Sequence, residues 1–269
     1  MASAALPETC AVPDSSPPDP MLWVWPGRAA YLGPSLELDP HSTSVYCVVV
    51  GVDAPFTLTA EDGTEISARS ALVPPRLVHR VVSPPPNRIL FCYADVNQAY
   101  LREHEVWRSD RCGPFRIGHR EESVLIDLCK APAPDGVAIT ATASGPPRRR
   151  LDPRIARTVE RMRSDPSSER SATDLARAES LSTPYFLRLF GRETGTSFRR
   201  YRLWLRMLAV ARTIAEGGDF TSAAMSAGFA SPSHFSDTFL RMFGLTATAL
   251  TASGVSIVVD ERLDSLRQS

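Results

Sequence analysis

The C-terminal part of the chain contains an internal repeat, and this repeat restricts the fold more than any other feature. At an offset of 49 residues, Ser182, Phe186, Phe190 and Gly195 recur as Ser231, Phe235, Phe239 and Gly244. Just before them, at an offset of 48, Thr173 and Ala176 recur as Thr221 and Ala224. A recurrence of this length indicates one supersecondary unit present twice.

Each copy has the features of a helix-turn-helix unit. Ala176 and Ala224 are small at the point where two helices must cross closely. Four residues later, Ser180 and Gly228 occupy the turn, where glycine suits a left-handed backbone. An ordinary helical bundle also places aromatic residues at helical spacing, but it has no reason to repeat turn, cap and core positions together.

The helical pattern begins at Asp152-Pro153, a cap residue followed by proline at the first helical position. Further helices are predicted at residues 173–178, 182–194, 197–216, 221–227 and 231–243, with Ser182 and Ser231 as caps. A helix of about 20 residues spans about 30 Å. Successive major-groove faces of B-DNA lie about 34 Å apart, so the helix over 197–216 can hold two recognition helices one turn apart.

Charge divides the chain in the same way. Residues 148–252 carry 17 basic and 10 acidic side chains, a net charge of +7. Residues 1–147 carry 11 basic and 17 acidic side chains, a net charge of −6. A basic half beside an acidic half indicates that the C-terminal half binds a polyanion.

Residues 153–252 resemble the DNA-binding domain of the AraC/XylS family of transcription regulators. The resemblance rests on Asp174–Ala176, Leu181-Ser182, Phe190–Phe198, Arg206–Ala211, Ala227–Phe239 and Arg241–Gly244. It implies a regulator that binds specific sequences in double-stranded DNA through two helix-turn-helix units. It also implies contact with RNA polymerase if the protein is an activator.

The resemblance assigns residues to the interface. Those facing outward on the first recognition helix are Thr183, Pro184, Leu187 and Arg188, with Arg192 near its end, and those on the second are Pro232, Ser233, Ser236 and Asp237. Arginine at 188 can bond to guanine through two donors. Phosphate contacts are expected from Ser182, Ser231, Arg199 and Arg200.

Two positions depart from the family pattern. Asp237 stands where a basic residue is common, so the base contacts of the second unit are in doubt. Ala247 stands where a proline usually closes the domain.

The N-terminal half has the pattern of a small β-barrel or sandwich. Short β-rich runs occupy residues 45–50, 56–59 and 88–93, and a turn is predicted at residues 61–64. More weakly, residues 70–79 resemble the cupin-like sensor domains that accompany such DNA-binding domains. We therefore expect this half to sense a small-molecule effector, to form a homodimer, or both.

Helices are expected at residues 97–109 and 119–130, and the second can either mediate dimerisation or pack on the barrel. His79 is isolated, whereas a metal needs three or four ligands. We expect His79 to be structural or to line a ligand pocket. No metal or other cofactor and no enzymatic activity are expected.

The predicted organisation is a flexible arm at 1–20, a cupin-like sensor or dimerisation domain at 21–130, a linker at 131–152, the DNA-binding domain at 153–252 and a tail at 253–269. Residues 1–20 lack the basic start and apolar core of a signal peptide, and the sequence has no run of about 18 apolar residues, so a cytoplasmic protein without membrane spans is expected.

Two alternatives stay open: a cupin-type metal enzyme, or a DNA alkylation-repair protein, that carries such a DNA-binding domain. The first lacks the His-x-His cluster. The second needs cysteines clustered around zinc, whereas the five cysteines lie scattered between positions 10 and 129 without a CxxC pair.

Overall fold

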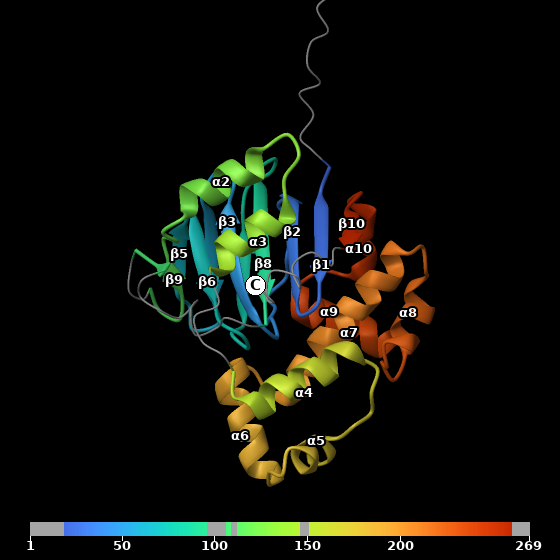
Figure 1. Cartoon of the computed structure of the whole chain (residues 1–269). Coiled ribbons are helices and arrows are strands. Elements are labelled where there is room, and N and C mark those ends of the chain that lie inside the picture. The colour runs from blue at the N-terminus through green and yellow to red at the C-terminus, as the bar shows by residue number, and fades with distance from the viewer. Residues whose placement is uncertain (1–18, 96–105, 109–111, 146–150, 260–269) are drawn as a thin grey trace, which may run out of the picture.

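The computed structural model of the protein describes residues 19–95, 106–108, 112–145 and 151–259. It has a β-rich N-terminal domain and a helical C-terminal domain, which confirms the predicted fold class (Figure 1). The described strands are β1 (Met21–Trp25), β2 (Arg28–Pro34), β3 (Tyr46–Gly51), β4 (Phe56–Ala60), β5 (Glu65–Ala68), β6 (Ser70–Val73), β7 (His79–Val82), β8 (Arg88–Ala94), β9 (Arg116–Ile117) and β10 (Ser256–Val259). The described helices are α2 (Glu122–Lys130), α3 (Gly136–Ser144), α4 (Pro153–Ser164), α5 (Ala172–Ala178), α6 (Thr183–Thr194), α7 (Phe198–Ala215), α8 (Phe220–Ser226), α9 (Pro232–Phe243) and α10 (Ala247–Ala252).

The strands form a seven-stranded sheet, in the order β10-β1-β2-β8-β3-β6-β9, and a three-stranded sheet, β5-β4-β7. Successive side chains of a strand point to opposite faces of a sheet. In the larger sheet both faces are buried, each in a different hydrophobic cluster. Trp23 and Trp25 lie on the face covered by α2 and α3. Val24, between them, belongs to the core shared with the smaller sheet and the C-terminal helices.

Helix α3 lies inside the segment for which the composition predicts a linker. The side chain of Asp135 caps it by accepting a hydrogen bond from the Val137 amide at 2.9 Å. Ile139 is fully buried, and Gly136 lies so close to the Trp23 ring that a Cβ would be 2.5 Å from it. The prediction of a continuous linker over 131–152 is therefore wrong between residues 136 and 144, because this apolar helix packs on the sheet.

The remaining helix predictions have separate outcomes. The helix expected over 119–130 is present as α2, three residues shorter at its start. The helix expected over 97–109 lies outside the described residues except for 106–108, where Trp107 forms a β-bridge with His119. The arm at 1–20 also lies outside them, apart from its last two residues. No described helix is both long and apolar enough to span a membrane.

The C-terminal tail contributes a strand to the N-terminal sheet. Strand β10 pairs in parallel with β1, with Met21 opposite Ser256, and the Ser256 amide donates to the Pro20 carbonyl at 2.8 Å. Figure 1 shows β10 beside β1, next to α10. The tail thus ties the end of the helical domain to the edge of the sheet.

Candidate nucleic-acid interface

The two helix-turn-helix units, α5–α6 and α8–α9, have matching turns. Ser180 and Gly228 have positive φ values of 55° and 86°. The next residues, Leu181 and Phe229, donate their amides to the carbonyls of the paired alanines 176 and 224 at 2.9 and 3.0 Å. The repeat predicted these turns, and each helix end from α5 to α9 lies within one residue of its predicted position.

On the first recognition helix, α6, the buried face consists of Phe186, Leu189 and Phe190. The candidate residues Pro184, Leu187, Arg188 and Arg192 are exposed, and Thr183 is half-buried. Among the described residues, Arg188 has no ion-pair or hydrogen-bond partner, so its guanidinium is available to a ligand. Ser182 holds the N-cap position, but its side chain makes no capping hydrogen bond.

On the second recognition helix, α9, the side chain of Ser231 does cap the helix, accepting from the His234 amide at 3.0 Å. Pro232, Ser233, Ser236 and Asp237 are exposed. The Ser236 hydroxyl donates to the Pro232 carbonyl at 3.1 Å. The exposed surface of α9 thus includes a carboxylate, that of Asp237.

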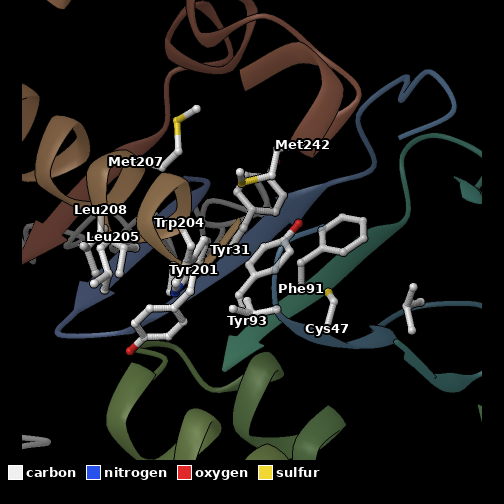
Figure 2. Close-up of a cluster of buried hydrophobic side chains, with 14 of the residues drawn as sticks. Tyr31, Cys47, Phe91, Tyr93, Tyr201, Trp204, Leu205, Met207, Leu208 and Met242 are labelled. Atoms are coloured by element: carbon white, nitrogen blue, oxygen red, sulfur yellow. The ribbon is translucent and has the colours of Figure 1, made fainter. Parts of the chain in front are cut away.

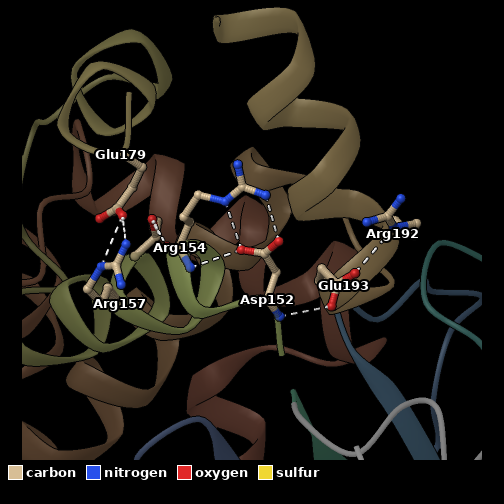
Figure 3. Close-up of polar contacts among 7 residues, drawn as sticks. Asp152, Arg154, Arg157, Glu179, Arg192 and Glu193 are labelled. Atoms are coloured by element: carbon tan, nitrogen blue, oxygen red, sulfur yellow. Dashed lines mark hydrogen bonds and ion pairs between the residues drawn. The ribbon is translucent and has the colours of Figure 1, made fainter. Parts of the chain in front are cut away.

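Buried carboxylates fix α4 against the first unit (Figure 3). Glu179, at the end of α5, is 1% exposed and pairs with Arg157 at 2.6 Å and Arg161 at 2.8 Å. Glu193, near the end of α6, accepts from the Asp152 amide at 3.2 Å and from Arg192 at 3.2 Å. Sequence reasoning missed both glutamates, since an acidic residue near a helix end has the same pattern when it is exposed.

The connecting helix, α7, begins beside the N-terminal domain. The Ser197 side chain caps it, accepting from the Arg200 amide at 3.3 Å. The Arg200 guanidinium donates to the carbonyls of Ser42 and Thr43, both at 3.2 Å, and to the Ser42 hydroxyl at 3.1 Å. Arg199 is exposed and has no such contact among the described residues. Of the two arginines among the four predicted phosphate contacts, only Arg199 is therefore free of such contacts in this conformation.

An apolar cavity of about 80 Å³ lies between the domains. The sheet contributes Tyr31, Phe91 and Tyr93, which Figure 2 shows together with Trp204 of α7. Phe243 of α9 also lines the cavity. The Trp204 indole N–H donates to the Gly27 carbonyl at 3.1 Å, so this side chain also links α7 to the turn after β1. Helix α7 thus borders both the DNA-binding unit and the cavity.

His79 lies away from this cavity. It is buried in β7, its ring stands 4.4 Å from that of His41, and its Nδ1 bonds to the Leu77 carbonyl at 3.0 Å. Burial and the neighbouring His41 lower the pKa of His79 to about 3. Among the described residues, no three histidine, cysteine or carboxylate side chains are grouped as metal ligands.

Comparison with known proteins agrees with the helical units. Residues 175–253 match the family described as "Helix-turn-helix domain". No curated protein sequence matches the chain.

Solved structures of ToxT from Vibrio cholerae are similar in fold over most of this chain. An apo point variant has 13% identity and a TM-score of 0.56, covering 84% of this chain and 97% of that one. ToxT bound to (E)-4-(8-methylnaphthalen-1-yl)but-3-enoic acid has 11% identity and a TM-score of 0.53, covering 84% and 99%. ToxT bound to an unsaturated fatty acid has 12% identity and a TM-score of 0.50, covering 83% and 93%.

Proposed function

Because residues 175–253 form an AraC-type helix-turn-helix domain, we propose that the chain is a transcription regulator that binds a specific DNA sequence through α6 and α9. The observation that carries the proposal is the tandem arrangement itself. Two units with the same turn geometry present exposed recognition helices, and an 18-residue helix connects them. At 1.5 Å per residue this helix is about 27 Å long, comparable with one turn of DNA.

Within this interface the residues have different roles. Arg188 reads a guanine from α6, and Thr183, Pro184 and Leu187 contact the neighbouring base edges or methyl groups. On α9, Pro232, Ser233, Ser236 and Asp237 form the second, weaker base-reading surface. Phosphates are bound by Arg192, Arg199 and the helix starts at Ser182 and Ser231. These roles are supported by the exposure of the side chains concerned, apart from Thr183 and Ser231, which are half-buried.

Selection from a library of random duplexes tests the proposal. The full-length protein is expected to enrich one sequence with two conserved elements whose centres lie about 10 base pairs apart, since two recognition helices on one face meet successive major grooves. The element bound by α6 is expected to contain a guanine. No enrichment after repeated rounds, with binding that is equal on all duplexes, would contradict a sequence-specific regulator.

The N-terminal domain is proposed to respond to an apolar effector in the cavity between the domains. The similar ToxT fold has been solved with an unsaturated fatty acid and with an aryl butenoic acid. Ligand sites of about 300–1,000 Å³ are usual, so a cavity of about 80 Å³ must widen to accept such a molecule. Widening moves α7 relative to the sheet, and α7 carries both recognition units.

Fluorescence titration tests this effector proposal. Adding an unsaturated fatty acid is expected to change the tryptophan emission of the full-length protein, because Trp204 lines the cavity. The variant Trp204→Phe is expected to lose most of the change, although Trp23, Trp25 and Trp107 remain. An emission change that is equal in both proteins would place the ligand elsewhere. Dimerisation through α2 and contact with RNA polymerase stay predictions.

A further inference from the structure

A second, polar cleft lies between the domains, and it shares no lining residue with the apolar cavity. Its volume is about 760 Å³. Four of the residues that line it are arginines: Arg76 from the turn between β6 and β7, Arg199 and Arg200 from the start of α7, and Arg241 from α9. None of the lining residues is acidic.

The positive charge of this arginine cleft is not neutralised within the described part of the protein. The bonds of Arg200 go to two carbonyls and a hydroxyl, which carry no net charge. No described carboxylate lies within ion-pair distance of Arg76, Arg199 or Arg241. The pKa of Arg200 is lowered by burial and by electrostatic repulsion from the Arg76 guanidinium. An anion between the walls would remove this repulsion.

On the helical side, the cleft is lined by the recognition helix α9 and by the start of α7, the helix that follows α6. Arg199 follows the end of α6 by five residues, while His234, Thr238 and Arg241 line the cleft from α9. Arg241 is one helical turn beyond the exposed Asp237, so it adjoins the proposed base-reading face of α9. A duplex that contacts both helices therefore carries its backbone past this position.

We infer that the arginine cleft binds the DNA backbone and that Arg76 brings the N-terminal domain into the DNA interface. This inference rests on the proposed function. The turn that carries Arg76 is fixed in place, because its amide donates to the Thr43 carbonyl at 3.0 Å and Arg200 bonds to the same carbonyl. The cleft is also larger than one phosphate or carboxylate group fills, which favours a run of backbone phosphates over a small anion.

The test is the salt dependence of DNA binding by the full-length protein, with Arg76→Ala compared with Arg120→Ala. Arg120 is an exposed arginine of the same domain, near the start of α2 and outside the cleft. Arg76→Ala is expected to weaken binding to specific and random duplexes equally and to reduce the log–log salt slope by about one unit. Arg120→Ala is expected to leave the slope unchanged. Arg76→Lys, which keeps the positive charge, is expected to have a slope close to that of the wild type.

Each other outcome overturns the inference in a recognisable way. If Arg76→Ala folds with an unchanged melting temperature and binds DNA with the wild-type slope, the N-terminal domain does not contact the backbone, while the proposed function stands. If inorganic pyrophosphate raises the melting temperature of the wild type but not of Arg76→Ala, and the slope is again unchanged, the cleft holds a small anion instead. If the wild type binds no duplex, the proposed function and this inference fail together.

Discussion

Asp95 and Arg163 form a buried ion pair that joins the two domains. The Arg163 guanidinium donates to both carboxylate oxygens of Asp95, at 2.7 and 2.9 Å, and the two side chains are 6% and 0% exposed. The Tyr201 hydroxyl donates to the same carboxylate at 2.5 Å. Asp95 follows β8, whereas Arg163 and Tyr201 lie on α4 and α7, so this polar contact fixes the helical domain against the sheet.

Removing the charge of Asp95 is expected to destabilise the protein strongly. Asp95→Asn leaves the Arg163 guanidinium buried without an anion, a change that costs about 3–5 kcal/mol. Urea unfolding measures the loss. The double variant Asp95→Leu/Arg163→Met is the control, since replacing both charges with apolar side chains is expected to recover most of the stability. A loss below about 1 kcal/mol in Asp95→Asn would show that solvent reaches Arg163.

The paired turn positions of the repeat provide a second prediction. Gly228 has φ of 86°, and a Cβ there would lie 3.0 Å from both the Arg206 guanidinium and the Ser167 carbonyl oxygen. Gly228→Ser is expected to lower the stability by about 1–2 kcal/mol, because left-handed backbone is costly for a residue with a Cβ. Ser180 already has φ of 55°, so Ser180→Gly is expected to change the stability by less than about 1 kcal/mol. Thermal melting of both variants checks this, and equal losses would contradict it.

The stability is also expected to depend on pH through His79. Its pKa is lowered to about 3 in the folded state, by burial and by His41, whereas the unfolded chain binds this proton near pH 6.5. The stabilisation from the neutral ring is therefore complete above pH 6.5 and is lost as the pH falls towards 3. Between these two pKa values the free energy of unfolding falls by about 1.4 kcal/mol for each pH unit. Urea unfolding of His79→Asn between pH 7 and 5 is expected to show a shallower slope than the wild type, and identical slopes would contradict the assignment.

The sequence predicted the helical units better than the contacts between domains. Turn, cap and core positions are local, so Ser180, Gly228 and Ser231 could be assigned from the repeat alone. Strand β10 could not be predicted, since its partner β1 lies more than 200 residues earlier and nothing near Ser256 indicates the pairing. The same holds for Arg200: its charge suggested a phosphate, but its acceptors lie in a distant loop.

For the candidate site, the sequence could predict which residues face outward but not which distant segments lie together. The exposed residues of α6 and α9 follow from helical periodicity, because the buried phenylalanines determine which positions face outward. The arginine cleft was not predicted, because one side of it is formed by the turn at Arg76, which only the tertiary structure brings near α7. The apolar cavity likewise combines Tyr31 and Phe91 from the sheet with Trp204 from a helix.

Base reading by Arg188 is the most direct test of the account. Affinities of the wild type, Arg188→Ala and Arg199→Ala are measured on the selected operator and on a scrambled duplex at several salt concentrations. Arg188→Ala is expected to lose about 1–3 kcal/mol on the operator and little on the scrambled duplex, and to relax the preference at one base pair. Arg199→Ala is expected to weaken both equally and to flatten the salt slope by about one unit. Equal losses on both duplexes for Arg188→Ala would contradict sequence reading by α6.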